Sequence, residues 1–140
     1  MESAALDKIE RPVDDGRLKN EQWGSDIAAN LLRDLGIEHI TINPGASFRG
    51  FHDSLVNHLG NRAPKILLCL NEDHVVSIAH GYAKATDKPM ACVLHSNVGL
   101  MHGSMAIFNA WCDRMPIVVM AQPAQATLSN VDLGSIGFTP

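Results

Sequence analysis

The sequence lacks several features that mark whole classes of protein. No apolar run approaches the roughly 20 residues of a membrane-spanning helix. The N-terminus, MESAALDKIERPVDDGR, has neither the basic start nor the apolar stretch of a signal peptide. Lys and Arg together number 11 against 15 Asp and Glu, and no basic run forms the stripe that nucleic acids require. We therefore expect a cytoplasmic protein that binds neither a membrane nor a nucleic acid.

Signatures of metal and nucleotide sites are also missing. The seven histidines form no HExxH motif and no zinc-ligand pairing with a CxxC, so we expect no metal site made by this chain alone. Gly45 and Gly50 have the outer spacing of a phosphate-binding loop, but Phe51 and His52 stand where Lys and Ser or Thr are required. No GxGxxG follows the first expected strand, which leaves a Rossmann dinucleotide site unsupported.

Cysteine is scarce, whereas ordinary globular composition is present. Cys69, Cys92 and Cys112 are odd in number, widely spaced and set in apolar surroundings, so we expect reduced, buried thiols rather than disulfides. Hydrophobic residues make up 46% and charged residues 19% of 140 residues. This length and composition predict one folded domain.

Strand and helix patterns alternate along the middle of the chain. Residues 1–22 show no sustained periodicity and are expected to form a flexible arm; residues 23–120 are expected to form the domain. A helix capped by Ser25 is predicted to turn Ile27, Leu31 and Leu35 toward a sheet. The remaining expected elements are strands at 37–42, 65–70, 90–94 and 117–120, and helices at about 47–60, from Asn71 onward, and 100–112. The strand at 65–70 is continuously apolar, as expected when both faces are covered. The alternation predicts a parallel α/β sheet with helices on both faces.

Three loops directly after expected strands carry the chemistry. In open parallel sheets, ligands bind beyond the carboxyl ends of the strands. The loops at 43–47, 71–74 and 95–99 therefore place Asn43, Glu72 and His95 on one rim. Glu72 lies in the first turn of a helix, where an acidic residue is commonly only a partner of the helix dipole. Position alone leaves its role open.

Three blocks of sequence favour a functional role for Glu72. They are NPGAS at 43–47, NEDHVVSIAHGYAKATDKP at 71–89 and VLHSNVGLMHGSMAIFNAWCDRMPIVVM at 93–120. They resemble the N-terminal pyrimidine-binding (PYR) domain of thiamine-diphosphate-dependent enzymes of the acetolactate synthase, pyruvate oxidase and benzoylformate decarboxylase group. The most characteristic part is E-x(8)-G-Y-A, which begins at Glu72. The resemblance implies a flavodoxin-like fold and a glutamate, Glu72, that hydrogen-bonds N1′ of the cofactor's aminopyrimidine. We also assign Pro44 and Gly45 to cofactor binding.

A carboxyl group suits that position for a physical reason. By sharing a proton with N1′ it favours the imino tautomer, whose nitrogen can remove the thiazolium C2 proton. Burial disfavours the charged form of a carboxylate, and we expect burial to help Glu72 hold that proton. Glu72 is the primary catalytic candidate.

His95 and Ser47 are the candidates for substrate contact. His95 resembles the active-site histidine of benzoylformate-type decarboxylases and is assigned to catalysis and substrate binding. The alternative interpretation, that His95 only satisfies backbone groups of its loop, stays open. Ser47 lies where the family's loop approaches substrate, whereas Asn71 is interpreted as a helix cap. The other histidines receive no role.

One helical face allows two interpretations. Met101, Met105, Phe108 and Trp111 recur at helical spacing, which we interpret as a core face; contact with another subunit is the alternative.

The resemblance leaves half of a site unaccounted for. Family members hold the diphosphate through Mg²⁺ in a second domain marked by a GDG motif, and this chain has none. The expected partner is therefore a complementary diphosphate-binding subunit or domain, or another copy of the chain. Residues 121–140 show no clear match, so we expect the domain to be incomplete at its C-terminus. A truncated enzyme and a natural short subunit both fit.

Two functions follow from these observations. The first is part of a thiamine-diphosphate-dependent lyase or transferase that decarboxylates or ligates small 2-oxo acids. The second is a catalytically silent regulatory or assembly domain that keeps the fold. A flavodoxin-like module for another nucleotide is a third possibility.

Overall fold

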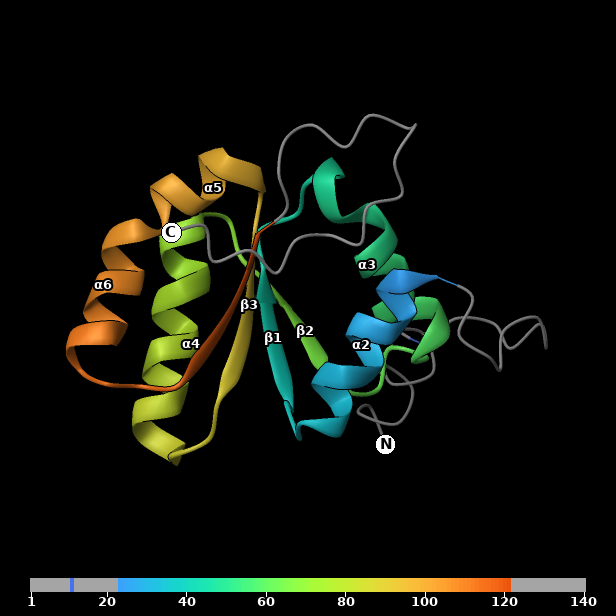
Figure 1. Ribbon diagram of the computed structural model, residues 1–140, viewed down its shortest axis with the longest axis horizontal. Coiled ribbons are helices and arrows are strands. Elements are labelled where there is room, and N and C mark those ends of the chain that lie inside the picture. Colours follow the sequence, from blue (N-terminus) through green and yellow to red (C-terminus); the bar gives the residue numbers. More distant parts are fainter. Residues whose placement is uncertain (1–10, 12–22, 122–140) are drawn as a thin grey trace, which may run out of the picture. The chain divides into compact units, whose positions relative to one another are not determined.

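The computed structural model describes residue 11 and residues 23–121 (Figure 1). The arm expected at residues 1–22 and the tail expected at 121–140 therefore lie almost entirely outside the described residues. The chain separates into two compact units. The first contains the described residues up to Glu38 together with Arg49–Lys65, and the second contains His39–Phe48 and the described residues from Ile66 onward. Each unit is described by itself.

Among its described residues, the first unit contains the helical elements α2 (Gly24–Asp34), α3 (Arg49–Asp53) and η2 (Ser54–His58), a π-helical turn. Trp23, not Ser25, is the N-cap of α2, and its backbone N–H donates to the Asp26 carboxylate at 3.0 Å. Ser25 instead accepts a hydrogen bond from the Ser54 hydroxyl at 2.9 Å. Gly36 has a φ of 76°, as expected for the glycine that ends a helix.

The apolar face predicted for α2 is wrong. Ile27, Leu31 and Leu35 are 47–67% exposed, whereas Ala29 and Leu32 are buried. The reason is the side on which η2 packs: Ser25, which bonds to Ser54 of η2, lies four residues before Ala29 and seven before Leu32. α2 therefore buries Ala29 and Leu32, and the side chains of Ile27, Leu31 and Leu35 face outward.

The second unit is built on a four-stranded sheet of order β2-β1-β3-β4. Its strands are β1 (His39–Ile42), β2 (Lys65–Leu68), β3 (Met90–Leu94) and β4 (Ile117–Ala121). β3 pairs in parallel with both β1 and β4, which confirms the expected parallel α/β architecture. The remaining elements of the unit are η1 (Ala46–Phe48), α4 (Glu72–Thr86), α5 (Ser96–His102) and α6 (Ser104–Cys112).

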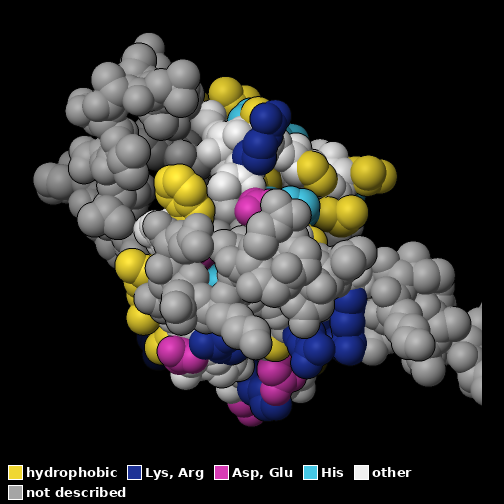
Figure 2. All heavy atoms as spheres, turned by 90° about the vertical axis from the view of Figure 1, so that its right-hand side faces the viewer, with side chains coloured by type: hydrophobic (Ala, Val, Ile, Leu, Met, Phe, Trp, Pro, Cys, Tyr) yellow, Lys and Arg dark blue, Asp and Glu magenta, His cyan; other side chains and the backbone are white. Residues whose placement is uncertain are grey.

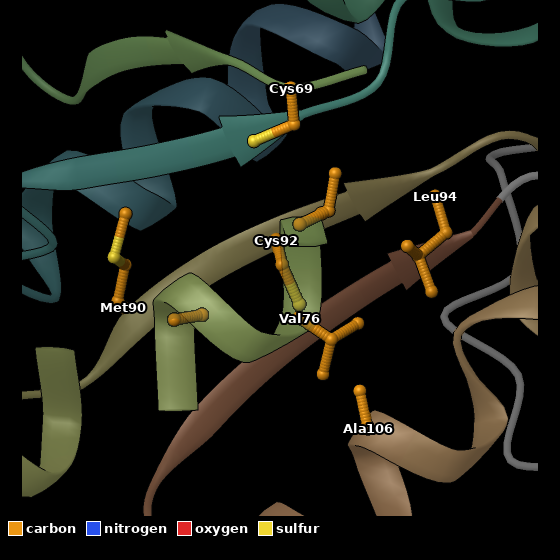
Figure 3. Packing of buried hydrophobic residues seen from close by; sticks show 8 residues of the cluster. Cys69, Val76, Met90, Cys92, Leu94 and Ala106 are labelled. Carbon is orange, nitrogen blue, oxygen red and sulfur yellow. The ribbon is translucent and has the colours of Figure 1, made fainter. Parts of the chain in front are cut away.

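The core of the second unit lies between the sheet and α4, with α6 packed beside α4 (Figure 3). Val76 of α4 points between Leu94 of β3 and Ala106 of α6. β3 is buried along its whole length because it is a central strand with β1 and β4 as neighbours. Burying side chains of this size stabilises the unit by about 1.5–3 kcal/mol each.

β2 is not the buried strand that its sequence predicts. Leu67 and Leu68 are 41% and 70% exposed, and Leu70 just beyond the strand is 96% exposed. β2 lies at one edge of the sheet, so that only β1 pairs with it among the described strands. A continuous apolar run therefore does not establish that both faces of a strand are buried.

The predicted helix at 100–112 is divided in two, and its predicted core face is wrong. α5 already begins at Ser96, where a turn was expected, and the chain bends at Gly103 before α6. Met101, Met105, Phe108 and Trp111 are 52–74% exposed. α6 buries its small residues, Ala106 and Ala110, and the large side chains point outward.

The cysteines follow the same distinction between core and surface. Cys69 and Cys92 are free and buried as predicted, but Cys112 is exposed because it ends α6. No described helix has the length and apolarity to cross a bilayer. In the face drawn in Figure 2, Lys and Arg are interspersed with Asp and Glu rather than gathered in one patch.

Candidate functional site

The strand order places a topological switch point at the carboxyl end of the sheet. From β1 the chain moves to β2 on one side, and β3 then takes the place on the other side of β1. Such a reversal of direction opens a crevice between the carboxyl ends of the two central strands, where α/β proteins commonly bind ligands. The loop after β1, residues 43–47, and His95 after β3 flank this point.

Glu72 is the first residue of α4. The side chain of Asn71 caps the helix by accepting a hydrogen bond from the Asp73 backbone N–H at 2.9 Å, which confirms its interpretation as a cap. The Glu72 side chain is only 13% exposed. Helix start and burial together hold this carboxyl group at the rim with little freedom.

Two side chains from other elements contact the Glu72 carboxyl group. Asn43, directly after β1, donates from Nδ2 to Oε1 at 2.8 Å. His102, the last residue of α5, lies with Nδ1 3.0 Å from Oε2. The predicted meeting of Asn43 and Glu72 on one rim is confirmed.

The electrostatics of Glu72 differ from our expectation. Burial raises the pKa of Glu72, but hydrogen bonds from Asn43, from His102 and from its own backbone N–H, with the charge of His102, outweigh burial and hold this pKa below its ordinary value. The expectation that burial would help Glu72 keep a proton is therefore wrong for this chain. At neutral pH the group is a carboxylate.

Gly99 of α5 makes room for this carboxylate. A Cβ at Gly99 would lie 3.1 Å from Cγ and 3.2 Å from Oε1 of Glu72, and 3.3 Å from the backbone carbon of Leu94. These distances are tighter than ordinary van der Waals contact. Any larger residue at position 99 would have to displace Glu72 or the end of β3.

His95 forms a second contact with the loop after β1. Its Nδ1 lies 2.7 Å from Oγ of Ser47, and its ring meets Phe48 edge to face at 6.4 Å. A Cβ at Gly45 would lie only 2.5 Å from Nδ1 of His95, so Gly45 is needed for this close approach. The sequence candidates Gly45, Ser47 and His95 are thus brought together.

The loop after β1, residues 43–47, contacts both Glu72 and His95. Asn43 contacts Glu72 and Ser47 contacts His95, and these two loop residues are four positions apart, at most about 14 Å along an extended chain. Pro44 between them is exposed, and its assignment to cofactor binding stays a prediction. The two polar pairs are therefore linked through one loop of five residues, 43–47.

Sequence reasoning missed His102. The signal was present: His102 follows His95 by seven residues, two helical turns, with Gly99 between them. It was overlooked because a turn was expected at 95–99, and only a helix that begins at Ser96 brings residue 102 back over the start of α4. Among the described residues, no cluster of three His, Cys, Asp or Glu side chains could hold a metal ion.

An apolar hollow of about 480 Å³ lies elsewhere in the second unit, lined by residues at the end of β2 and on α4. Neither Glu72 nor His95 lines it. The side chains of Ser47, Glu72 and His95 therefore lie outside this hollow.

Comparison with known proteins agrees with this geometry. The profile of the family described as "Thiamine pyrophosphate enzyme, N-terminal TPP binding domain" matches residues 22–135. Benzoylformate decarboxylase of Pseudomonas aeruginosa is 30% identical over 113 residues, which are 76% of this chain and 20% of that protein. The acetolactate synthase large subunit of Haemophilus influenzae is 27% identical over 109 residues, or 78% of this chain and 18% of that protein.

A solved structure gives the same result. The thiamine diphosphate-dependent 4-hydroxybenzoylformate decarboxylase of Rhodococcus jostii is similar with a TM-score of 0.65 and 28% identity, over 79% of this chain and 21% of that one. The chain thus spans about a fifth of the length of these proteins. The matched family profile, the strand order and the three sequence blocks agree: this chain belongs to the N-terminal, TPP-binding domains of thiamine pyrophosphate enzymes.

Proposed function

We propose that this chain binds the aminopyrimidine of thiamine diphosphate at the rim beside Glu72, as one part of a decarboxylase or carboligase acting on small 2-oxo acids. The observation that supports this most is the Glu72 carboxylate, fixed by Asn43 and His102 at the first turn of α4. When bound, the cofactor supplies a nucleophilic carbon that adds to the substrate carbonyl.

The residues present fit the pyrimidine half of the cofactor. A carboxylate oxygen accepts about two hydrogen bonds, so each oxygen of Glu72 keeps capacity beyond Asn43 and His102 for a ring N–H. The absence of a side chain at Gly99 lets Glu72 pack directly against α5. The diphosphate and Mg²⁺ have no such counterpart in the described residues, and we propose that a partner domain or subunit holds them.

Glu72 then accepts a hydrogen bond from the N1′–H of the imino tautomer. Because Glu72 is ionised, it stabilises a proton on that ring nitrogen, and this favours the imino form of the exocyclic amine. Its two fixed hydrogen bonds keep the carboxylate oriented, so little reorganisation is needed when the ring arrives. Replacement by an amide would remove the charge and leave the shape.

His95 and Ser47 are proposed to contact the 2-oxo acid. Ser47 occupies Nδ1 of His95, and Nε2 has no partner among the described residues. If the Ser47 hydroxyl donates to Nδ1, then Nε2 carries the hydrogen and can donate to a substrate carboxylate or carbonyl oxygen. This pair would orient the substrate and move protons on it.

Thiamine itself, which lacks the diphosphate, tests the pyrimidine site in the 140-residue chain. We expect weak binding that shifts the backbone amide signals of Glu72, Gly99 and Gly45 in NMR spectra. Glu72→Gln should abolish these shifts, because the carboxylate that accepts the N1′ proton is lost. Asp73→Asn is the matched control: it removes the neighbouring, exposed carboxylate of the same helical turn.

Equal loss in both variants, or shifts confined to the β2–α4 hollow, would overturn the proposed site.

A second measurement separates an enzyme from a silent domain. With a diphosphate-binding partner and Mg²⁺ added, exchange of the C2 proton of thiamine diphosphate should be fast in the wild type and much slower in Glu72→Gln. Exchange no faster than in free cofactor would favour the silent domain.

A further inference from the structure

The imidazole of His102 lies within hydrogen-bonding distance of the Glu72 carboxylate, the group that we propose binds the cofactor. Its Nδ1 lies 3.0 Å from Oε2 of Glu72, while Asn43 occupies Oε1. The two partners differ in kind: Asn43 has a fixed amide donor, whereas an imidazole can gain or lose a proton near neutral pH. Of these two partners of Glu72, only His102 has an ionisable side chain.

The direction of the hydrogen bond follows from the state of Glu72. An ionised carboxylate accepts hydrogen bonds and cannot donate them. Nδ1 of His102 must then carry the hydrogen, either in the imidazolium or in the neutral Nδ1–H tautomer. Glu72 thereby selects the tautomer of His102.

The two groups differ in their access to water. The Glu72 side chain is 13% exposed, whereas that of His102 is 55% exposed. His102 therefore lies between the solvent and the mostly buried carboxylate of Glu72. Helix α5 brings it there because Ser96 starts the helix and Gly99, one turn before His102, leaves space for the Glu72 side chain.

We propose that His102 is a positioning residue that orients the Glu72 carboxylate through the contact between its Nδ1 and Oε2 of Glu72, so that the hydrogen bonding of the cofactor site depends on the imidazole at the end of α5. The role in cofactor activation rests on the proposed function, but the pairing itself does not. When N1′ shares its proton with Glu72, the Nδ1–H of His102 helps to hold the negative charge on the carboxylate.

The other titratable groups near Glu72 do not contact its carboxylate as His102 does. Asp73 and His74 follow it on α4 and are exposed, with no hydrogen bond to its carboxylate. His95, at the end of β3, is engaged with Ser47. On β1 and its loop the contact is Asn43, which does not titrate.

The test uses the cofactor-free chain, so its outcome does not depend on thiamine binding. The Glu72 carboxyl signal is followed by ¹³C NMR from pH 7 to pH 3 in the wild type, His102→Ala, His102→Gln and the control His74→Ala. We expect an upward shift of the Glu72 titration midpoint in His102→Ala and a smaller one in His102→Gln, whose amide can still donate. His74→Ala should leave the midpoint close to the wild-type value.

The tautomer of His102 supplies a second readout, which a merely structural role would not change. In ¹⁵N spectra at pH 8, the wild-type chain should carry the hydrogen on Nδ1, and Glu72→Gln should lose this preference. Equal Glu72 midpoints in the wild type and His102→Ala, with the fold intact by circular dichroism, would overturn the proposal. Normal pairing without thiamine binding at Glu72 would instead overturn the proposed function and leave the pairing established.

Discussion

At the scale of single residues, the site depends on two positions where a side chain would not fit. Gly45 admits the ring of His95, and Gly99 admits the carboxylate of Glu72. Neither residue has the positive φ that usually explains a glycine, so close approach is the reason for both. Gly81, the first letter of the GYA block, is exposed and a Cβ there would meet nothing within 4 Å.

Gly99→Ala should therefore displace the Glu72 carboxylate. We expect a loss of about 1–3 kcal/mol in the free energy of unfolding from overpacking, together with loss of the thiamine-induced NMR shifts. Gly81→Ala is the matched control, because it adds the same methyl group to an open position in helix α4. It should stabilise the chain by about 0.5–1 kcal/mol and leave thiamine binding unchanged. Urea unfolding measures both; similar effects of the two changes would contradict the assignment of Gly99.

At the scale of elements, α4 is held at both ends. Its N-terminal residue is the site glutamate, and its second half is joined to the end of α6 through Asp113. The Asp113 carboxylate accepts from Lys84 at 2.7 Å and lies 3.0 Å from Nε2 of His80. The hydrogen bond and charge of Lys84, followed by the hydrogen bond of His80, hold the pKa of Asp113 below its ordinary value of 3.8.

This contact predicts a dependence of stability on pH. A carboxyl group with a lowered pKa in the folded state contributes stability above its unfolded pKa, and this contribution is lost as pH falls through the folded pKa. Asp113→Asn should therefore destabilise the chain at pH 7 and flatten the decline between pH 5 and pH 3, measured by urea unfolding at each pH. Asp87→Asn is the control, since Asp87 ends the same helix in the left-handed region that Asn also tolerates. A decline in Asp113→Asn as steep as in this control would refute the contact's role.

At the scale of the whole chain, large apolar side chains remain outward on α5 and α6. Met101, Met105, Phe108 and Trp111 are all more than half exposed, and Phe108 and Trp111 stack with ring centroids 5.8 Å apart. Exposed apolar groups of this size favour association with another chain. The chain also spans only about a fifth of its relatives, which leaves room for partner domains in the proteins it resembles.

We therefore predict concentration-dependent association of the isolated chain. Sedimentation velocity should show species larger than the monomer at high concentration, and Phe108→Ser with Trp111→Ser should shift the population toward monomer. Ile27→Ser with Leu31→Ser on α2 provides a comparison at similarly exposed apolar positions. A wild-type monomer at all concentrations, or equal effects of both pairs, would argue against α5 and α6 as the contact surface.

The sequence by itself determined the order of elements and the rim on which the chemistry lies. Strand and helix periods are local properties, and the parallel topology then places Asn43, Glu72 and His95 at one end of the sheet. The Asn71 cap was also readable, because it depends on neighbouring backbone groups alone.

Only the tertiary structure decided which apolar faces are covered and which partners surround Glu72. The outward side chains of α2 and α6 share the helical spacing of core residues, and spacing does not say where the neighbouring element packs. The His102 contact depends on the start of α5 at Ser96 and on the space at Gly99. The lowered pKa of Glu72 likewise results from donors 29 and 30 residues away in sequence, which outweigh the effect of burial that the sequence suggested.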